Sequence, residues 1–342
     1  QKTEDAMYLF EPSDDSGSFR CLICPHECVI KPGRSGLCRV RENDGSGIRL
    51  STYGAISSYA SEPVEKKPLY HFFPGHHILS VGSYGCNLRC DFCQNDEISQ
   101  HGRQADCIEL SAEELALRAQ LIPGNIGLAY TYNEPGIWFE YVIDCAAAIK
   151  EQGQFNIMIT NGYINRGPLA EYIKLTDAFN VDLKGFSDDF YRKYTGGSLK
   201  QVLDNLVMIS DGGRHLEITT LIIPGLNDSD ESMQEEARWI SESLGPDVPL
   251  HISRYFPRYR RTDPATPPET IRRLSMVASE HLDYIYTGNM PAYAGGSDTV
   301  CPSCGQMLIK RAGYEIKNTG LTSEGRCSVC GKNIIPGSFV RL

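Results

Sequence analysis

Apolar runs of strand length alternate with amphipathic segments along most of this chain. The strand-like runs cover residues 78–84, 127–131, 156–160, 178–184, 216–223, 249–253 and 284–287. Segments with helical spacing of apolar residues lie between them, at residues 111–121, 137–150, 203–210, 233–244 and 269–281. This alternation is typical of a parallel α/β architecture. It predicts a partial (β/α) TIM-type barrel of about six parallel strands, with its active site at the C-terminal ends of the strands.

Two of the expected strands carry polar side chains at alternate positions. Asn180, Asp182 and Lys184 share one face of the fourth strand, and His251 and Ser253 share one face of the sixth. Helices cover the outside of such a barrel and require apolar contacts there, so the polar faces should point to the interior. Their position at the active end favours ligand contacts over a structural ion pair between Asp182 and Lys184.

Cysteine-containing segments flank the expected barrel on both sides. Residues 1–70 are predicted to be an N-terminal metal-binding extension, and residues 71–295 the barrel. Residues 296–342 are predicted to be a small C-terminal metal-binding module.

The composition is ordinary for a globular protein, with 41% hydrophobic and 22% charged residues. No run is long and apolar enough to span a bilayer, and no signal-peptide pattern opens the chain, so no membrane partner is expected. A net charge of −10 disfavours nucleic acid as a partner. Thirteen cysteines, all but Cys107 and Cys145 in three clusters, indicate metal binding in a reducing compartment. The expected location is cytoplasmic.

The central cluster, Cys86-x3-Cys90-x2-Cys93, has three cysteines rather than four. A closed structural metal site takes four protein ligands, whereas a catalytic site keeps one position open. A 4Fe–4S cluster held by three thiolates leaves one iron free for another ligand. On spacing alone, a zinc ion that borrows a distant fourth ligand remains the alternative.

The run from Gly85 to Asn95 resembles the signature of the radical S-adenosylmethionine (SAM) superfamily, in which SAM chelates the fourth iron of a 4Fe–4S cluster. From about residue 76 to about residue 259 the chain is similar to the pyruvate formate-lyase activating enzyme branch of that superfamily. Further matching runs occur in the same order: Tyr132-Asn133-Glu134-Pro135, Ile159-Thr160-Asn161-Gly162, Asp182-Leu183-Lys184 and Ile223-Pro224-Gly225-Leu226-Asn227-Asp228. Together these runs favour the cluster over zinc.

The resemblance implies a role for each matching residue, with Cys86, Cys90 and Cys93 as the cluster ligands. Glu134 and Asn133 should bind the SAM ammonium, although both family glycines before the glutamate are replaced here. Lys184 should reach the SAM carboxylate, and the backbone of Phe92 should lie against the adenine. The remaining expected SAM-binding residues are Thr160 and Asp182. Ile159 stands where the family has aspartate, at a monovalent-cation site built beside SAM.

A closer similarity covers nearly the whole chain. The N-terminal Cys-x2-Cys-Pro-His-x-Cys run and the segments at residues 70–75, 81–86 and 251–257 resemble the radical SAM component of the AmmeMemoRadiSam system. Members of that group accompany Memo-like and AMMECR-type proteins, which are therefore expected partners. The resemblance does not supply a substrate.

Each outer cluster offers four cysteines. The C-terminal cluster has the two CxxC knuckles of a zinc ribbon, with a rubredoxin-like iron site as the alternative; its members are Cys301, Cys304, Cys327 and Cys330. The N-terminal cluster can close a site for zinc or for an auxiliary 4Fe–4S cluster, and its spacing decides for neither; its members are Cys21, Cys24, Cys28 and Cys38. His26 is expected to donate a hydrogen bond beside that site rather than to bind the metal.

The resemblance implies an enzyme that reductively cleaves SAM to a 5′-deoxyadenosyl radical, which then abstracts hydrogen from a substrate. His251 is expected to contact SAM or that substrate. A flavodoxin- or ferredoxin-type protein is the expected electron donor. Two alternatives stand beside this function: an activase that places the radical on a glycine of a partner enzyme, and a non-catalytic multi-metal scaffold or zinc-ribbon adaptor.

Overall fold

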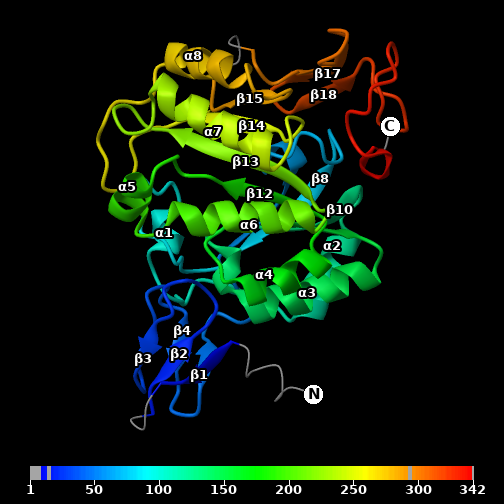
Figure 1. Ribbon diagram of the computed structural model, residues 1–342. Coiled ribbons are helices and arrows are strands. Elements are labelled where there is room, and N and C mark those ends of the chain that lie inside the picture. Colours follow the sequence, from blue (N-terminus) through cyan, green and yellow to red (C-terminus); the bar gives the residue numbers. More distant parts are fainter. Residues whose placement is uncertain (1–8, 14–16, 292–294, 341–342) are drawn as a thin grey trace.

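The centre of the computed structural model, which describes residues 9–13, 17–291 and 295–340, is an eight-stranded sheet (Figure 1). In spatial order its strands are β15 (Ile285–Gly288), β14 (Leu250–Arg254), β13 (His215–Ile222), β12 (Ala178–Asp182), β11 (Phe155–Thr160), β10 (Asn125–Tyr130), β8 (His77–Gly82) and β7 (Ser58–Pro63). The strands from β8 to β15 pair in parallel, and β7 is antiparallel to β8. The predicted α/β partial barrel is confirmed, with seven parallel strands instead of about six.

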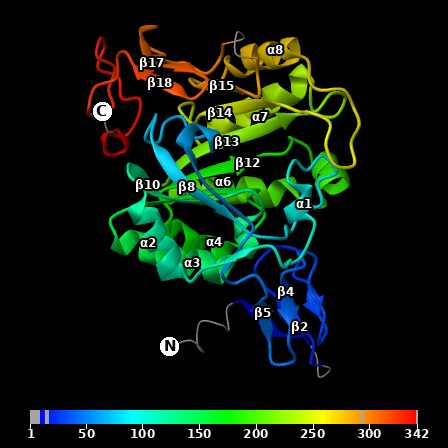
Figure 2. The same cartoon turned by 180° about the vertical axis from the view of Figure 1, so that it is seen from behind.

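Helices cover the outer face of this sheet, as the connections between parallel strands require. They are α2 (Ala112–Leu121), α3 (Phe139–Glu151), α4 (Arg166–Leu175), α6 (Leu199–Asp211), α7 (Asp230–Ser243) and α8 (Pro268–Ala278). Two short helices, α1 (Asp96–Ser99) and α5 (Asp188–Phe190), lie in the loops that follow β8 and β12. Helices α6 and α7 lie in front of the strands in Figure 1 and behind them in the view from the other side (Figure 2).

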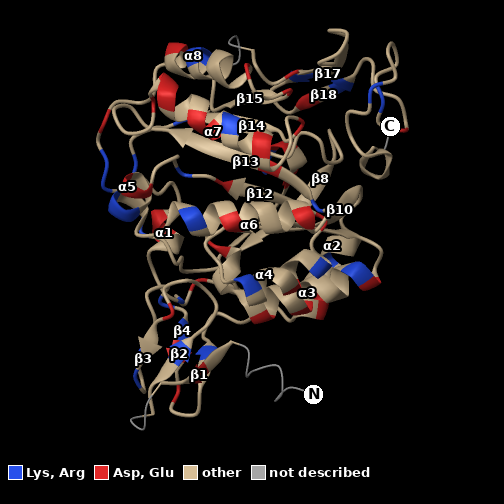
Figure 3. Cartoon of the chain, viewed as in Figure 1, with Lys and Arg blue, Asp and Glu red and all other residues tan. Residues whose placement is uncertain are grey.

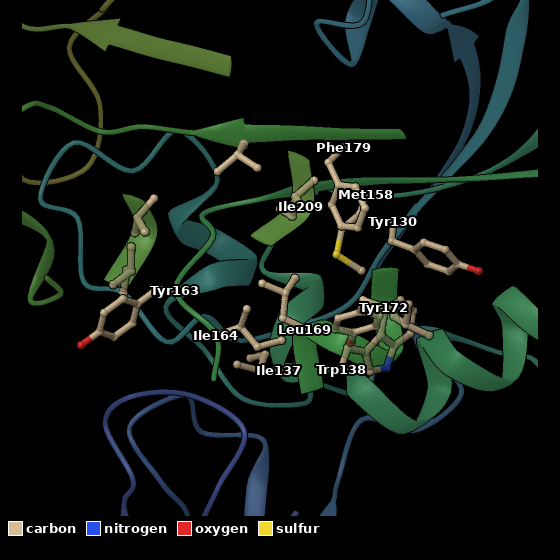
Figure 4. Close-up of a cluster of buried hydrophobic side chains, with 14 of the residues drawn as sticks. Tyr130, Ile137, Trp138, Met158, Tyr163, Ile164, Leu169, Tyr172, Phe179 and Ile209 are labelled. Carbon is tan, nitrogen blue, oxygen red and sulfur yellow. The ribbon is translucent and has the colours of Figure 1, made fainter. Parts of the chain in front are cut away.

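The core between sheet and helices is apolar and closely packed. Tyr130 on β10, Met158 on β11 and Phe179 on β12 project toward side chains of α4 and α6, among them Leu169 and Ile209 (Figure 4). All five side chains are at most 2% exposed. This layer fixes the strands, so the loops at their C-terminal ends project from a rigid base.

The capping box predicted at the start of the second helix is present. The Ser111 hydroxyl accepts a hydrogen bond from the backbone N–H of Glu114 at 3.1 Å, and the Glu114 carboxylate accepts one from the N–H of Ser111 at 2.8 Å. These two bonds satisfy backbone donors that the first turn of α2 would otherwise leave free.

The N-terminal lobe lies at one end of the barrel, below α1 and α4 in Figure 1. Its short strands are β1 (Phe10–Pro12), β2 (Phe19–Cys21), β3 (Val29–Ile30), β4 (Arg41–Asn43) and β5 (Ile48–Leu50). The first three form one antiparallel sheet, and β4 and β5 form a hairpin. A further strand, β6 (Ala55–Ile56), pairs with β9 (Ile108–Glu109), and the chain then enters the central sheet at β7.

The C-terminal module packs on the barrel through a buried arginine. The module is built on β16 (Thr299–Val300), β17 (Met307–Ala312) and β18 (Glu315–Asn318), which form one antiparallel sheet. Arg311 on β17 donates hydrogen bonds to the carbonyl oxygen of Tyr70 at 2.8 Å and to the hydroxyl of Thr299 at 2.7 Å. Its Nε lies 3.8 Å from Oε1 of the buried Glu65, so the contact joins the last part of the chain to the first edge of the barrel.

Charged residues of both signs interleave on α7 and α8 (Figure 3). In the described part of the chain, no helix has the length and hydropathy needed to cross a membrane.

Candidate active site at the ends of the parallel strands

A cavity of about 480 Å³ opens at the C-terminal ends of the parallel strands. This volume lies in the range of about 300–1,000 Å³ that small-molecule sites occupy. Its walls include most of the predicted site residues: Cys86, Cys90, Phe92, Cys93, Asn133, Glu134, Thr160, Asp182 and Lys184. Four segments of the chain, each distant from the next in sequence, therefore bring predicted residues to one site.

The three cysteines lie in the loop that follows β8. Cys90 is buried, and Cys86 and Cys93 are half-buried. Burial raises the pKa of the Cys90 thiol to about 12 and that of Cys86 well above its usual value. Such thiols become thiolates only when a metal replaces the proton. The backbone N–H of Leu88 donates to the Cys86 sulphur at 3.3 Å, a contact that also suits a metal-bound thiolate.

Glu134 lies in the loop that follows β10 and is 2% exposed. Its Oε1 accepts hydrogen bonds from the N–H of Gly136 and from the hydroxyl of Thr160, both at 2.7 Å. Its Oε2 accepts one from the N–H of Asn161 at 2.8 Å. Burial outweighs these bonds and raises the pKa of Glu134. A buried carboxylate with an acceptor position left is a suitable partner for an ammonium group.

Asn161 joins this carboxylate to the cysteine loop. Its side-chain amide donates to the Cys86 sulphur at 3.6 Å and to the side-chain oxygen of Asn87 at 2.9 Å. Sequence reasoning assigned a role to Thr160 and overlooked Asn161, although both belong to the same matching run. The run ending β11 therefore braces both Glu134 and Cys86.

Asp182 and Lys184 face the cavity together, as their alternation in the sequence predicts. The Nζ of Lys184 lies 2.7 Å from Oδ2 of Asp182. Burial opposes the charge on Lys184, but Asp182 and the nearby Cys90 outweigh it and raise the pKa of the lysine. Lys184 is thus a fixed cation on the cavity wall, and its remaining N–H groups can bind a carboxylate.

Asn133 and Tyr132 occupy the positions where the related family has glycines. The Asn133 side chain accepts a hydrogen bond from the N–H of Ser83 at 2.9 Å and donates to the carbonyl oxygens of Tyr84 and Gly85. Its amide is thereby committed to the backbone that leads into Cys86. Tyr132 adopts a φ of 71°, a left-handed conformation that costs a non-glycine residue about 1 kcal/mol or more. Its hydroxyl donates to Glu62 at 2.7 Å and holds the segment in place.

Residues 80–239 match the family model of the radical SAM superfamily. This range includes the three cysteines, Glu134 and Lys184 of the cavity. The chain contains a radical SAM domain. It is also homologous to pyruvate formate-lyase activating enzymes: it is 30% identical over 158 residues to that of Clostridium pasteurianum. This match covers 46% of the chain and 66% of the activating enzyme, just under two thirds of its length.

Two further comparisons extend over more of the chain. An uncharacterized protein of Methanocaldococcus jannaschii is 39% identical over 334 residues, 96% of this chain and 98% of that protein. The crystal structure of Streptococcus suis SuiB bound to the precursor peptide SuiA superposes with a TM-score of 0.51 at 15% identity. That superposition covers 68% of this chain and 52% of SuiB, and it shows a shared fold. Membership of the radical SAM superfamily implies a 4Fe–4S cluster and SAM, and the cavity and its donor groups fit both.

The structure of this radical SAM protein does not bring His251 into the cavity wall. His251 is 3% exposed, and its Nε2 lies 2.6 Å from Oε2 of Glu217. Glu217 also accepts hydrogen bonds from the N–H groups of Tyr70 and His71 at 3.0 and 2.7 Å. In the same strand, Ser253 does line the cavity. The alternation of polar and apolar residues correctly predicted which face of β14 points to the interior. It could not predict which residue on that face lies close enough to the C-terminal end of the strand to reach the cavity.

Sequence reasoning missed one side of the cavity altogether. Glu62, Lys66 and Lys67, which precede the expected start of the barrel, line it together with Tyr314 of the C-terminal module. Glu62 binds both lysines, at 3.1 Å from the Nζ of Lys66 and 2.5 Å from that of Lys67. Burial opposes the charge on Glu62, but these partners and Tyr132 outweigh it and lower its pKa to about 2. Glu62 and Lys66 are four residues apart, a spacing that predicts an ion pair between them. It does not predict that the pair lines a cavity.

The C-terminal cysteines of this radical SAM protein come together closely. All four sulphurs lie within 4.8 Å of one another, and two of the separations are 3.5 and 3.6 Å. A tetrahedral zinc ion at about 2.3 Å from each thiolate sets the sulphurs about 3.8 Å apart, so this group fits zinc. The N-terminal cysteines surround a separate small cavity beside the barrel.

Proposed function

We propose that this protein is an enzyme that cleaves SAM reductively and abstracts hydrogen from a substrate. The observation that carries the proposal is the convergence of three cysteines, one buried carboxylate and one half-buried cation on a single cavity. A 4Fe–4S cluster and SAM bound there would supply an electron and a 5′-deoxyadenosyl radical. The chain itself supplies the anchors, since the cluster leaves binding and orientation to the protein.

Each anchor has a distinct task in this proposal. Glu134 accepts hydrogen bonds from the SAM ammonium, and Lys184 donates to the SAM carboxylate. Thr160 and Asn161 hold Glu134 in the orientation that this requires. Asn133 acts indirectly, because its amide fixes the backbone before Cys86.

The proposed substrate is a small molecule, a peptide or a protein modified within an AmmeMemoRadiSam system. Similarity along nearly the whole chain supports this, and it makes Memo-like and AMMECR-type proteins the proposed partners. A flavodoxin- or ferredoxin-type protein is the proposed electron donor. Because all thirteen cysteines are free thiols, we place the reaction in a reducing cytoplasm. Zinc is the proposed metal of the C-terminal module.

A glycyl-radical activase is the second candidate. It is favoured by homology to pyruvate formate-lyase activating enzymes and by 24% identity over 215 residues to a putative glycyl-radical enzyme activating enzyme of Methanocaldococcus jannaschii. An electron-resonance doublet from a glycine radical in a candidate partner, formed only with SAM and reductant, would select this candidate. Deuterium transfer from a labelled partner or small molecule without that doublet would select the first.

The proposal is tested by anaerobic reconstitution with iron and sulfide, followed by SAM and dithionite. The wild type should form 5′-deoxyadenosine. Cys90→Ala should abolish it, whereas Cys145→Ala, which alters a buried cysteine in the core of α3, should leave it intact. Absence of 5′-deoxyadenosine from a wild-type protein that carries its cluster would refute the function.

A further inference from the structure

The four N-terminal cysteines enclose a cavity of about 10 Å³, beside the loop that carries the three central cysteines. This is room for one water-sized sphere. Its lining includes all four thiols, the guanidinium of Arg41 and the side chain of Asn87. A zinc ion at about 2.3 Å from four thiolates would leave no such space between them.

The separation of the sulphurs distinguishes this group from the C-terminal one. Among the described residues, the C-terminal four are the cysteine group whose sulphurs all lie within 4.8 Å of one another. The N-terminal four do not form such a group, and neither do Cys86, Cys90 and Cys93. An iron–sulfur cubane holds one thiolate on each iron and so spreads its ligands further apart than one zinc ion does. The N-terminal thiols and the expected cluster ligands are therefore both spread more widely than the C-terminal four.

A buried cation completes the surroundings of this cavity. Arg41 is 1% exposed, and its Nη1 binds Oε2 of Glu140 at 2.5 Å. Its Nε and Nη2 are buried and have no hydrogen-bond partner in the described structure. The guanidinium also lies within hydrogen-bonding reach of the Cys21 sulphur. These two N–H donors on the wall of a thiol-lined cavity suit cluster thiolates and sulphides as acceptors.

The N-terminal cavity adjoins the central cysteines through Asn87, the residue after Cys86. The Asn87 side chain lies within hydrogen-bonding reach of the Cys24 sulphur and accepts from Asn161, which also contacts Cys86. His26 donates to the carbonyl oxygen of Asn87 at 2.8 Å, in the supporting role expected of it. Asn87 thus lies between the N-terminal cysteines and the central cysteines.

The segment that carries the central cysteines packs closely against the segment that carries Cys38, and Gly85 lies at the contact. A side-chain Cβ at this position would lie 2.4 Å from the carbonyl oxygen of Cys38. Cys28, which also lines the N-terminal cavity, is half-buried, so one edge of the site reaches toward solvent.

We propose that Cys21, Cys24, Cys28 and Cys38 hold a second 4Fe–4S cluster, which passes one electron from an external one-electron donor to the cluster at Cys86, Cys90 and Cys93. The donor is oxidised by one electron, the second cluster is reduced and then reoxidised, and the first cluster is reduced. No bond or proton changes in this step. The metal assignment stands by itself, whereas the relay rests on the proposed function.

The metal assignment is tested with a Cys86→Ala/Cys90→Ala/Cys93→Ala variant, reconstituted anaerobically. We expect about four irons and four sulfides per chain, against about eight in the wild type. On reduction, the variant should give an electron-resonance signal that does not change when SAM is added. Less than about one iron per chain, with about two zinc ions instead, would overturn the assignment.

Two further measurements protect the test from misfolding of that variant. A Cys24→Ala/Cys38→Ala variant should keep about four irons and a signal that SAM does alter, and Cys145→Ala should keep about eight. In the fully reduced wild type, the two signals should show mutual spin–spin broadening that neither multiple variant shows. A wild type with about eight irons and no broadening would overturn the close placement of the clusters.

The relay is tested in a single reduction. Protein is reduced fully, the reductant is removed, and SAM is added. Since each cleavage consumes one electron, the wild type should form about twice as much 5′-deoxyadenosine as Cys24→Ala/Cys38→Ala. Equal yields would overturn the relay. No product from either protein would refute the proposed function and leave the iron count to decide the second cluster separately.

Discussion

Replacing Glu134 by glutamine isolates the charge that is proposed to bind the SAM ammonium. The substitution keeps the size of the side chain and exchanges one acceptor oxygen for an NH₂ donor. If that NH₂ takes the place of Oε2 it meets the N–H of Asn161, and if it takes the place of Oε1 it meets the N–H of Gly136. Either orientation leaves one buried backbone donor without an acceptor, at a cost to folding of about 1–3 kcal/mol.

The substitution should also weaken the binding of SAM, which is measured separately from the stability of the fold. Loss of the negative charge removes a charge-assisted hydrogen bond worth about 1.5–3 kcal/mol. At about 1.4 kcal/mol for each factor of ten, the Kd for SAM should rise about 10- to 100-fold. Because burial already raises the pKa of Glu134, the wild type should also bind SAM more weakly as the pH falls and the carboxylate is protonated.

Isothermal titration of SAM into anaerobically reconstituted protein measures this Kd. Glu236→Gln is the matched control, because Glu236 is also a fully buried carboxyl, hydrogen-bonded to the Thr220 hydroxyl, but it does not line the cavity. Its Kd should equal that of the wild type. A Glu134→Gln protein with full iron content and a Kd within about threefold of the wild type would refute the role of Glu134.

Three other substitutions test the surroundings of the site. Gly85→Ala should lower the iron content and stability more than Gly124→Ala, because both residues have positive φ but only Gly85 faces a backbone oxygen at 2.4 Å; equal losses would contradict this. Burial raises the pKa of Glu236 from 4.5 to about 8, so between these values the folded state keeps a proton that the unfolded state loses. The free energy of unfolding therefore falls by about 1.4 kcal/mol per pH unit in this range. The Tm of Glu236→Gln should exceed that of the wild type by more at pH 8 than at pH 6. An equal difference in Tm at both pH values would contradict this effect of Glu236. His251→Ala should lower the Tm and leave the Kd for SAM within about threefold, since its partner is Glu217, whereas a tenfold rise would indicate direct contact.

Much of the barrel was predictable because its parallel strands are buried on both faces and are therefore continuous apolar runs. The run at 78–84 corresponds to β8, and the capping box at Ser111 marks the start of α2. The edge strand β7 was not predicted, since its residues are half-buried or exposed along its whole length. An edge strand lacks a second neighbour and so lacks the strong apolar signal of a central one.

The candidate site also has a part that was predictable from the sequence and a part that was not. Residues at strand ends, such as Glu134 and Lys184, were identified because a local motif surrounds them. Contacts between distant segments were not predictable: Tyr314 reaches the cavity only through the packing of the C-terminal module, and the amide of Asn133 binds the backbone just after β8. Long-range contacts of this kind depend on the assembled fold rather than on local pattern.

The buried arginine that ties the C-terminal module to the barrel has a consequence for the order of folding. The parallel strands join the sheet in chain order, so each can find its neighbour as the polypeptide leaves the ribosome. Arg311, however, binds the carbonyl oxygen of a residue 241 positions earlier. Until Arg311 has been synthesised and its module has packed on the barrel, Glu65 lies at the barrel edge without its cation. The first edge of the barrel is thus completed by a segment that is synthesised well after it, and a chain released before Arg311 would expose that acidic edge to the quality-control machinery of the cell.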